Sequence, residues 1–71
     1  MKYTVIYEQG ELAWGAYVPD LPGVITVGDS RQEVESLIRE AVEFHIEGLR
    51  AEGLPVPPPA SWAGTLEIPA A

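Results

Sequence analysis

The prolines of this 71-residue chain fall mainly in two clusters, and these limit where helices and strands can form. Proline has a fixed φ and no N–H to donate, so it ends helices and interrupts central strands. The first cluster, Pro19-Asp20-Leu21-Pro22-Gly23, therefore predicts a turn that ends on a residue tolerant of positive φ. The second cluster lies within residues 54–61 and includes Pro55 and Pro57, which predicts a stiff, extended strap.

Three short strands are predicted before the helix. Residues 2–8 are rich in β-branched and aromatic side chains, which suit a pleated surface. Gln9-Gly10-Glu11 has the length and composition of a hairpin loop, and a second strand follows over residues 12–18. Residues 24–27 form the third strand, after the first proline cluster. Consecutive short strands with tight connections usually pair antiparallel, so we expect a three-stranded meander.

A single amphipathic helix is predicted to begin at Arg31. Ser30 and Glu33 match a capping box, in which two side chains accept hydrogen bonds from amides at the helix start. Apolar residues then recur at three- and four-residue steps, so one face must pack on the sheet. These apolar residues are Val34, Leu37, Ile38, Ala41, Val42, Ile46 and Leu49. Gly53 is the predicted C-terminal stop of the helix.

The other face of this helix is strongly acidic. Its carboxylates belong to Glu33, Glu35, Glu40, Glu43, Glu47 and Glu52. Arg39 is placed four residues from both Glu35 and Glu43, the spacing at which helical ion pairs form.

After the helix, the strap is expected to return the chain to the sheet. Residues 62–68 then form a fourth strand, which Pro69 ends. The predicted fold class is α+β, with the order β-β-β-α-β and one helix packed on one face of an antiparallel-rich sheet. Residues 1–71 make a single domain, because compact domains usually begin near 50 residues. No element covers the other sheet face in this arrangement.

The net charge of −7 and the absence of cysteine narrow the function classes. Four basic residues against eleven acidic ones disfavour direct nucleic-acid binding and favour a basic protein partner. Disulfides are excluded, and one histidine makes a metal site improbable; no cofactor is predicted. The chain has no run approaching the ~18 apolar residues of a membrane span and no signal peptide, so we expect a cytoplasmic protein.

Two further expectations come from size and composition. A single core this small rarely supplies more than about 3 to 5 kcal/mol, so self-association into a homodimer or higher oligomer is the remaining means of stabilisation. An edge strand or the uncovered sheet face could be buried in this way. Asparagine is absent as well as cysteine, and depletion of such thermolabile residues is typical of proteins from thermophiles.

The segment from Ala16 to Ser30 resembles the strand-turn-strand of HicB-type antitoxins, whose members carry a Tyr-Val-Pro-Asp-Leu-Pro-Gly turn. Residues 40–49 and 52–57 are similar to the helix end and proline strap of that family, so the resemblance covers nearly the whole chain. Val24 stands where many members have cysteine. Longer members continue into a DNA-binding domain, whereas this chain ends at Ala71 and is expected to be a short, single-domain member.

The resemblance implies a partial ribonuclease-H-like fold in a type II antitoxin that binds and masks a small basic toxin, a HicA-like mRNA endonuclease. The alternative is an orphan, self-associating protein of the same fold with no toxin. An enzyme is disfavoured because Asp20 and Asp29 lie in a turn and beside a helix cap rather than converging on a metal. No catalytic pair links His45 to Ser61 either.

Six residues are candidates for partner binding: Trp14, Asp20, Leu21, Glu40, Glu43 and Glu47. Together the glutamates would steer a basic partner, although a solvated face is the simpler explanation of each one alone. Turn geometry alone also explains Asp20 and Leu21. The size of Trp14 and Trp62 suits either a core or an interface, as does His45 on the helix. The residues expected to hold the local structure are Pro19, Pro22, Gly23, Ser30, Glu33, Pro55 and Pro57.

Overall fold

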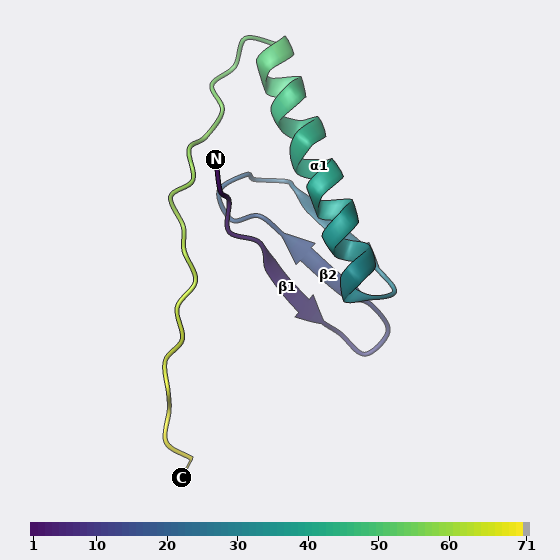
Figure 1. The fold of residues 1–71 in the computed structure, drawn as a ribbon, viewed down its shortest axis with the longest axis vertical. Helices are drawn as coiled ribbons and strands as arrows, with labels where there is room; N and C mark the ends of the chain where they lie inside the picture. The colour runs from purple at the N-terminus through teal and green to yellow at the C-terminus, as the bar shows by residue number, and fades with distance from the viewer. Residues whose placement is uncertain (71) are drawn as a thin grey trace.

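The structure, a computed structural model, describes residues 1–70 and contains three strands and one helix (Figure 1). The strands are β1 (Ile6–Gln9), β2 (Trp14–Tyr17) and β3 (Ile25–Gly28), and they are followed by the helix α1 (Arg31–Ala51). The sheet is antiparallel with the order β1-β2-β3. This confirms the α+β class and the predicted succession of three strands and a helix.

The first two strands are shorter than the composition predicts, and the register and the hairpin loop explain why, whereas β3 has the predicted length and is shifted by one residue. Ile6 pairs with Tyr17, so Thr4 would lie opposite Pro19, which has no N–H for a ladder. The first strand therefore starts only at Ile6. At the other end of β1 the Gly10 N–H donates to the Ala13 carbonyl at 2.8 Å, which closes a loop of residues 10–13. The second strand consequently begins two residues later than predicted.

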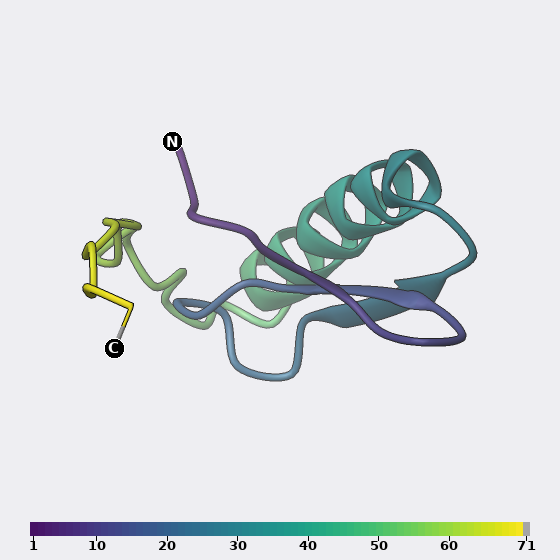
Figure 2. The ribbon, with the colours of Figure 1, turned by 90° about the horizontal axis from the view of Figure 1, so that it is seen from below.

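The core lies between the sheet and α1, which packs chiefly on β2 and β3. Six hydrophobic side chains are buried there: Ala16, Val18, Leu21, Val24, Val34 and Ile38. Five of the seven residues in the predicted apolar stripe of the helix are only half-buried. On the other side of the sheet Ile25 and Val27 are each 66% exposed. No element among residues 1–70 covers that face (Figure 2).

The predicted helix start is confirmed. The Ser30 Oγ accepts from the Glu33 N–H at 3.1 Å, as an N-cap should. The Glu33 Oε2 accepts from the Asp29 N–H at 3.0 Å, one residue before the amide that a standard capping box uses. Both side chains thus satisfy backbone donors where the chain leaves β3 and enters α1.

The predicted helix stop is confirmed as well. Gly53 has φ +71°, a left-handed conformation that glycine adopts without steric cost. Its N–H donates to the Arg50 carbonyl at 3.1 Å, and the Leu54 N–H donates to the Leu49 carbonyl at 2.9 Å. This is the Schellman arrangement, and it turns the chain sharply into the strap.

The fourth strand predicted over residues 62–68 is wrong for this chain on its own. Residues 62–70, called the arm from here on, are extended, pair with no strand and project away from the sheet (Figures 1 and 2). The radius of gyration is 14.3 Å, whereas a compact chain of this length should have about 11 Å. Trp62, Leu66 and Ile68 are 86%, 83% and 72% exposed. Residues 62–68 have the composition of a strand, but they pair with no strand of this chain.

Candidate functional site

Asp20, in the first proline turn, holds the end of the strap. Its Oδ2 accepts from the backbone N–H groups of Ala60 and Ser61, each at 2.9 Å, and its Oδ1 accepts from the Ser61 hydroxyl at 2.8 Å. These hydrogen bonds, led by that from the Ala60 amide, lower the pKa of the Asp20 carboxyl. The ionised side chain thus joins two segments that are 40 residues apart in the sequence.

The N-terminal segment holds the strap from a second side. The Tyr3 hydroxyl donates to the Pro57 carbonyl, and the Thr4 hydroxyl donates to the Ser61 carbonyl at 2.6 Å. The strap therefore does return to the sheet region, as predicted. The arm begins directly after Ser61, the residue that both Thr4 and Asp20 contact.

We expect Asp20→Asn to loosen this anchor. The lowered pKa means that the folded chain favours ionised Asp20, so the anchor is complete above the ordinary value of 3.8 and is lost as the pH falls through the lowered pKa. Amide NMR should show acid-dependent shifts of Ala60 and Ser61 that disappear in Asp20→Asn, together with faster hydrogen exchange of both amides. Asp29→Asn is the matched control, because Asp29 acts through its backbone N–H. Acid shifts of equal size in Asp20→Asn would contradict this assignment.

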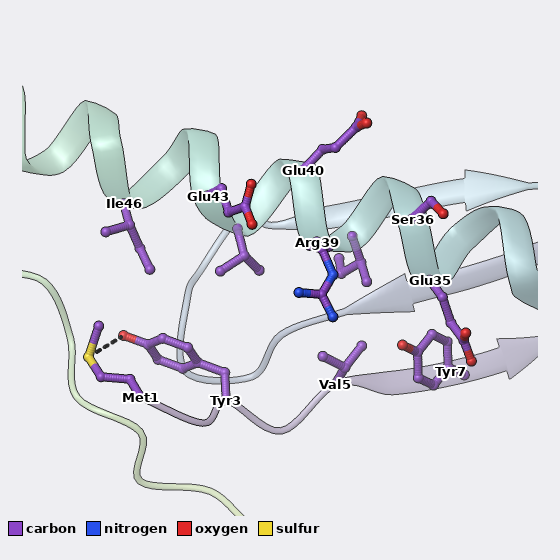
Figure 3. Close-up of a pocket in the computed structure, with 12 residues that line it drawn as sticks. Met1, Tyr3, Val5, Tyr7, Glu35, Ser36, Arg39, Glu40, Glu43 and Ile46 are labelled. Atoms are coloured by element: carbon purple, nitrogen blue, oxygen red, sulfur yellow. Dashed lines mark hydrogen bonds between the residues drawn. The ribbon is translucent and has the colours of Figure 1, made fainter.

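A groove of about 690 Å³ runs between α1 and residues 1–7, which lead into β1 (Figure 3). It is open because the helix packs on β2 and β3 and leaves β1 less covered. Tyr3, Val5 and Tyr7 project into it at alternate positions and are only half-buried. Val42 and Ile46 add apolar surface from the helix. Charged residues that also line it are Glu35, Arg39, Glu40 and Glu43.

The predicted glutamates form an exposed acidic stripe, defined as Glu40, Glu43 and Glu47. Their spacing of three and four residues places them along one side of α1, and Glu40 points away from the groove in Figure 3. The ion pair that forms on the helix joins Arg31 Nε to Glu35 Oε1 at 3.3 Å, rather than using Arg39. All three side chains of the stripe are exposed, and Glu40 and Glu43 also border the groove.

The other candidate residues have contacts within the chain. Leu21 is fully buried in the core, so in this conformation it presents no surface to a partner. Trp14 is half-buried and packs against the same core. Asp20 is engaged with the strap, and His45 is half-buried on the helix. Of the six candidates, only the three glutamates of the acidic stripe are exposed.

The described part of the chain offers neither a metal site nor a membrane-spanning helix. Residues 1–70 contain no group of three or more histidine, aspartate or glutamate side chains placed to hold a metal ion. Within the same residues, α1 is too polar to cross a membrane.

The sequence reading missed the groove and the anchor. The alternation of Tyr3, Val5 and Tyr7 is a period-two signal that could have indicated a common face. No local signal marks Ala60 and Ser61 as partners of Asp20, because that contact depends on how the strap folds back.

These features define a class of small, acidic α+β protein with one helix on an antiparallel meander and a proline strap. A family model described as the HicB-like antitoxin of bacterial toxin-antitoxin systems matches residues 3–70. The chain therefore belongs to the HicB-like antitoxin family.

Individual relatives agree with this assignment. Antitoxin HicB 2 of Photorhabdus laumondii is 32% identical over 99% of the chain, which spans 51% of that relative. A UPF0150 protein of Synechocystis sp. is 46% identical over 79% of the chain and 72% of its own length. A UPF0150 protein of Thermoplasma acidophilum is 38% identical over 80% and 84%, respectively. The chain thus spans about half the length of the named antitoxin. No solved structure matches it.

Proposed function

We propose that this protein is a type II antitoxin that binds and masks a small basic toxin, a HicA-like mRNA endonuclease. The observation that carries the proposal is the exposed acidic stripe on α1, in a chain of net charge −7 that belongs to an antitoxin family. A ribonuclease must present Lys and Arg to RNA phosphates. Carboxylates on a rigid helix can compete for those groups while the bulk of the domain blocks access to them.

The mechanism requires no chemistry from this chain. Inhibition is steric and electrostatic, so the antitoxin has no catalytic activity of its own and no cofactor. The protein acts in the cytoplasm as a homodimer and makes no direct contact with nucleic acid. Long-range attraction between its negative surface and a basic toxin accelerates their encounter, and salt weakens this attraction.

The second candidate is an orphan, self-associating protein that has the family fold but no toxin. The observation that favours it is the exposed arm with three large apolar side chains, since such surfaces usually mark sites of protein association. Self-association belongs to both candidates, so only the presence of a toxin separates them.

The deciding experiment is a pull-down of the tagged protein from its native cells at low and high ionic strength, followed by mass spectrometry. We expect one small basic protein that is recovered at low salt and reduced at high salt. Purified separately, that protein should degrade mRNA, and adding the antitoxin should stop the degradation. Recovery of the tagged chain alone would replace the antitoxin proposal with the orphan one.

A further inference from the structure

We propose that the arm completes the sheet of a second copy of this chain, lying along the β1 edge in the groove beneath α1. Each protomer would thereby receive from its partner the fourth strand that it lacks. The inference rests on the homodimer in the proposed function, but it does not require a toxin.

The arm has the side-chain pattern of a half-buried strand. The alternate positions 62, 64, 66 and 68 carry Trp62, Gly64, Leu66 and Ile68, and the three large side chains among them are largely exposed. The intervening positions carry Ala63, Thr65 and Glu67, of which the last two suit a solvent-facing side. An amphipathic strand of this kind needs both a sheet edge to pair with and an apolar surface to cover. In the single chain the arm pairs with no strand and covers no apolar surface.

The β1 side of the sheet offers both. The strand β1 is an edge, and an edge strand presents backbone N–H and C=O groups for further pairing. Tyr3, Val5 and Tyr7 line the groove beside it and remain half-buried (Figure 3). The opposite edge is a poorer site, because α1 already packs over β3. The exposed side chains of β3, Ile25 and Val27, face away from the helix.

The anchor at Ser61 explains why the arm leaves its own groove empty. Asp20 and Thr4 fix Ser61 beside the proline turn, and the chain after it runs away from the body of the domain (Figures 1 and 2). An arm that is fixed at its base and directed outward is presented to another molecule. The anchor therefore acts as the hinge from which the strand is exchanged.

The surface area of the single chain agrees with a missing partner. Its accessible surface is 5707 Å², whereas a folded monomer of 7.7 kDa should expose about 4,300 Å². The surplus exceeds the roughly 800 Å² that each partner buries in a standard stable interface. A reciprocal exchange about a twofold axis buries two arms and two grooves at once and leaves no free end for further growth.

Light scattering on the purified full-length chain tests the exchange first. We expect the parent chain to be a dimer. We expect Leu66→Asp to raise the dissociation constant of this dimer by roughly 30-fold or more, because a central apolar contact is lost. Thr65→Asp is the matched control, since it adds the same charge on the solvent-facing side and should leave the dimer intact. Both positions are exposed in the single chain, so circular dichroism should show both variants folded. An unchanged dimer in Leu66→Asp would overturn the proposal.

Isotope-filtered NMR on a mixture of labelled and unlabelled protein then locates the arm. We expect cross-peaks between Leu66 or Ile68 methyl groups of one copy and Tyr3 or Tyr7 ring protons of the other. The same cross-peaks arising only within one chain, or contacts only between the two arms, would overturn the exchange but keep a dimer. A monomer would overturn both the exchange and the homodimer of the proposed function, while leaving toxin binding to its own test.

Discussion

Leu21→Ala is expected to remove most of the stability of the folded chain. Leu21 is 0% exposed and is one of two large side chains that are completely buried, the other being Val34. Truncating a buried leucine costs about 2 to 5 kcal/mol, because the apolar contacts are lost and a cavity remains. A single core of this size rarely supplies more than about 3 to 5 kcal/mol. The variant should therefore be largely unfolded or close to its midpoint at room temperature.

Thermal unfolding followed by far-ultraviolet circular dichroism measures this loss. Each kcal/mol shifts Tm by roughly 4 to 8 °C in a domain of 60 to 100 residues, so the expected decrease is of the order of 10 to 30 °C. Leu12→Ala is the matched control, because Leu12 is 95% exposed in the hairpin loop. That variant should stay within about 0.5 kcal/mol of the parent chain. Equal losses in the two variants would show that Leu21 is not a core residue.

The backbone of the first proline turn explains why Leu21 is buried. The Leu21 N–H donates to the Val18 carbonyl, and the Val24 N–H donates to the Leu21 carbonyl, both at 3.1 Å. Gly23 has φ +86°, as expected from its position in the turn. The turn thus directs Leu21 inward while it presents Asp20 to the strap. Its composition predicts the change of direction, but it cannot predict which side chains point inward.

The helix was predictable because its signals are local. Ser30 and Glu33 lie within one turn of each other, and the N–H groups of Gly53 and Leu54 donate to carbonyls three and five residues before them. Contacts of this kind depend only on residues close together in the sequence, and the helix starts and stops in the structure where they predict. The apolar stripe likewise predicted which face meets the sheet, although most of the stripe is only half-buried.

The arm and the anchor were not predictable for the opposite reason. Alternating side chains in residues 62–68 record that one face of the segment is suited to burial, but they do not specify which sheet supplies the partner. The anchor joins Asp20 to Ala60 and Ser61, which lie 40 and 41 positions further along the chain, so it depends on the path of the strap. A polar side chain in a turn has many potential hydrogen-bond partners, and the tertiary structure determines which of them it meets.

Reversing the charge of the acidic stripe is expected to produce the largest effect on binding of the proposed toxin. In the triple variant Glu40→Lys, Glu43→Lys and Glu47→Lys, the net charge changes from −7 to −1, since each exchange alters it by two. Electrostatic steering raises association rates by about 10- to 1,000-fold. At low salt, the association rate constant of the triple variant should therefore decrease by a factor within that range. All three side chains are exposed, so the fold should be retained.

The effect should depend on where the charges lie as well as on their number. Glu8→Lys, Glu11→Lys and Glu67→Lys change the net charge equally at exposed positions outside the helix, which makes them the matched control. Association rates measured by stopped flow across a range of ionic strengths separate the two variants. The parent and the control should lose rate steeply with salt, because screening shortens the reach of charge attraction, whereas the stripe variant should respond weakly. Equal rates and equal salt slopes in both variants would show that net charge alone attracts the toxin and that α1 is not its docking face.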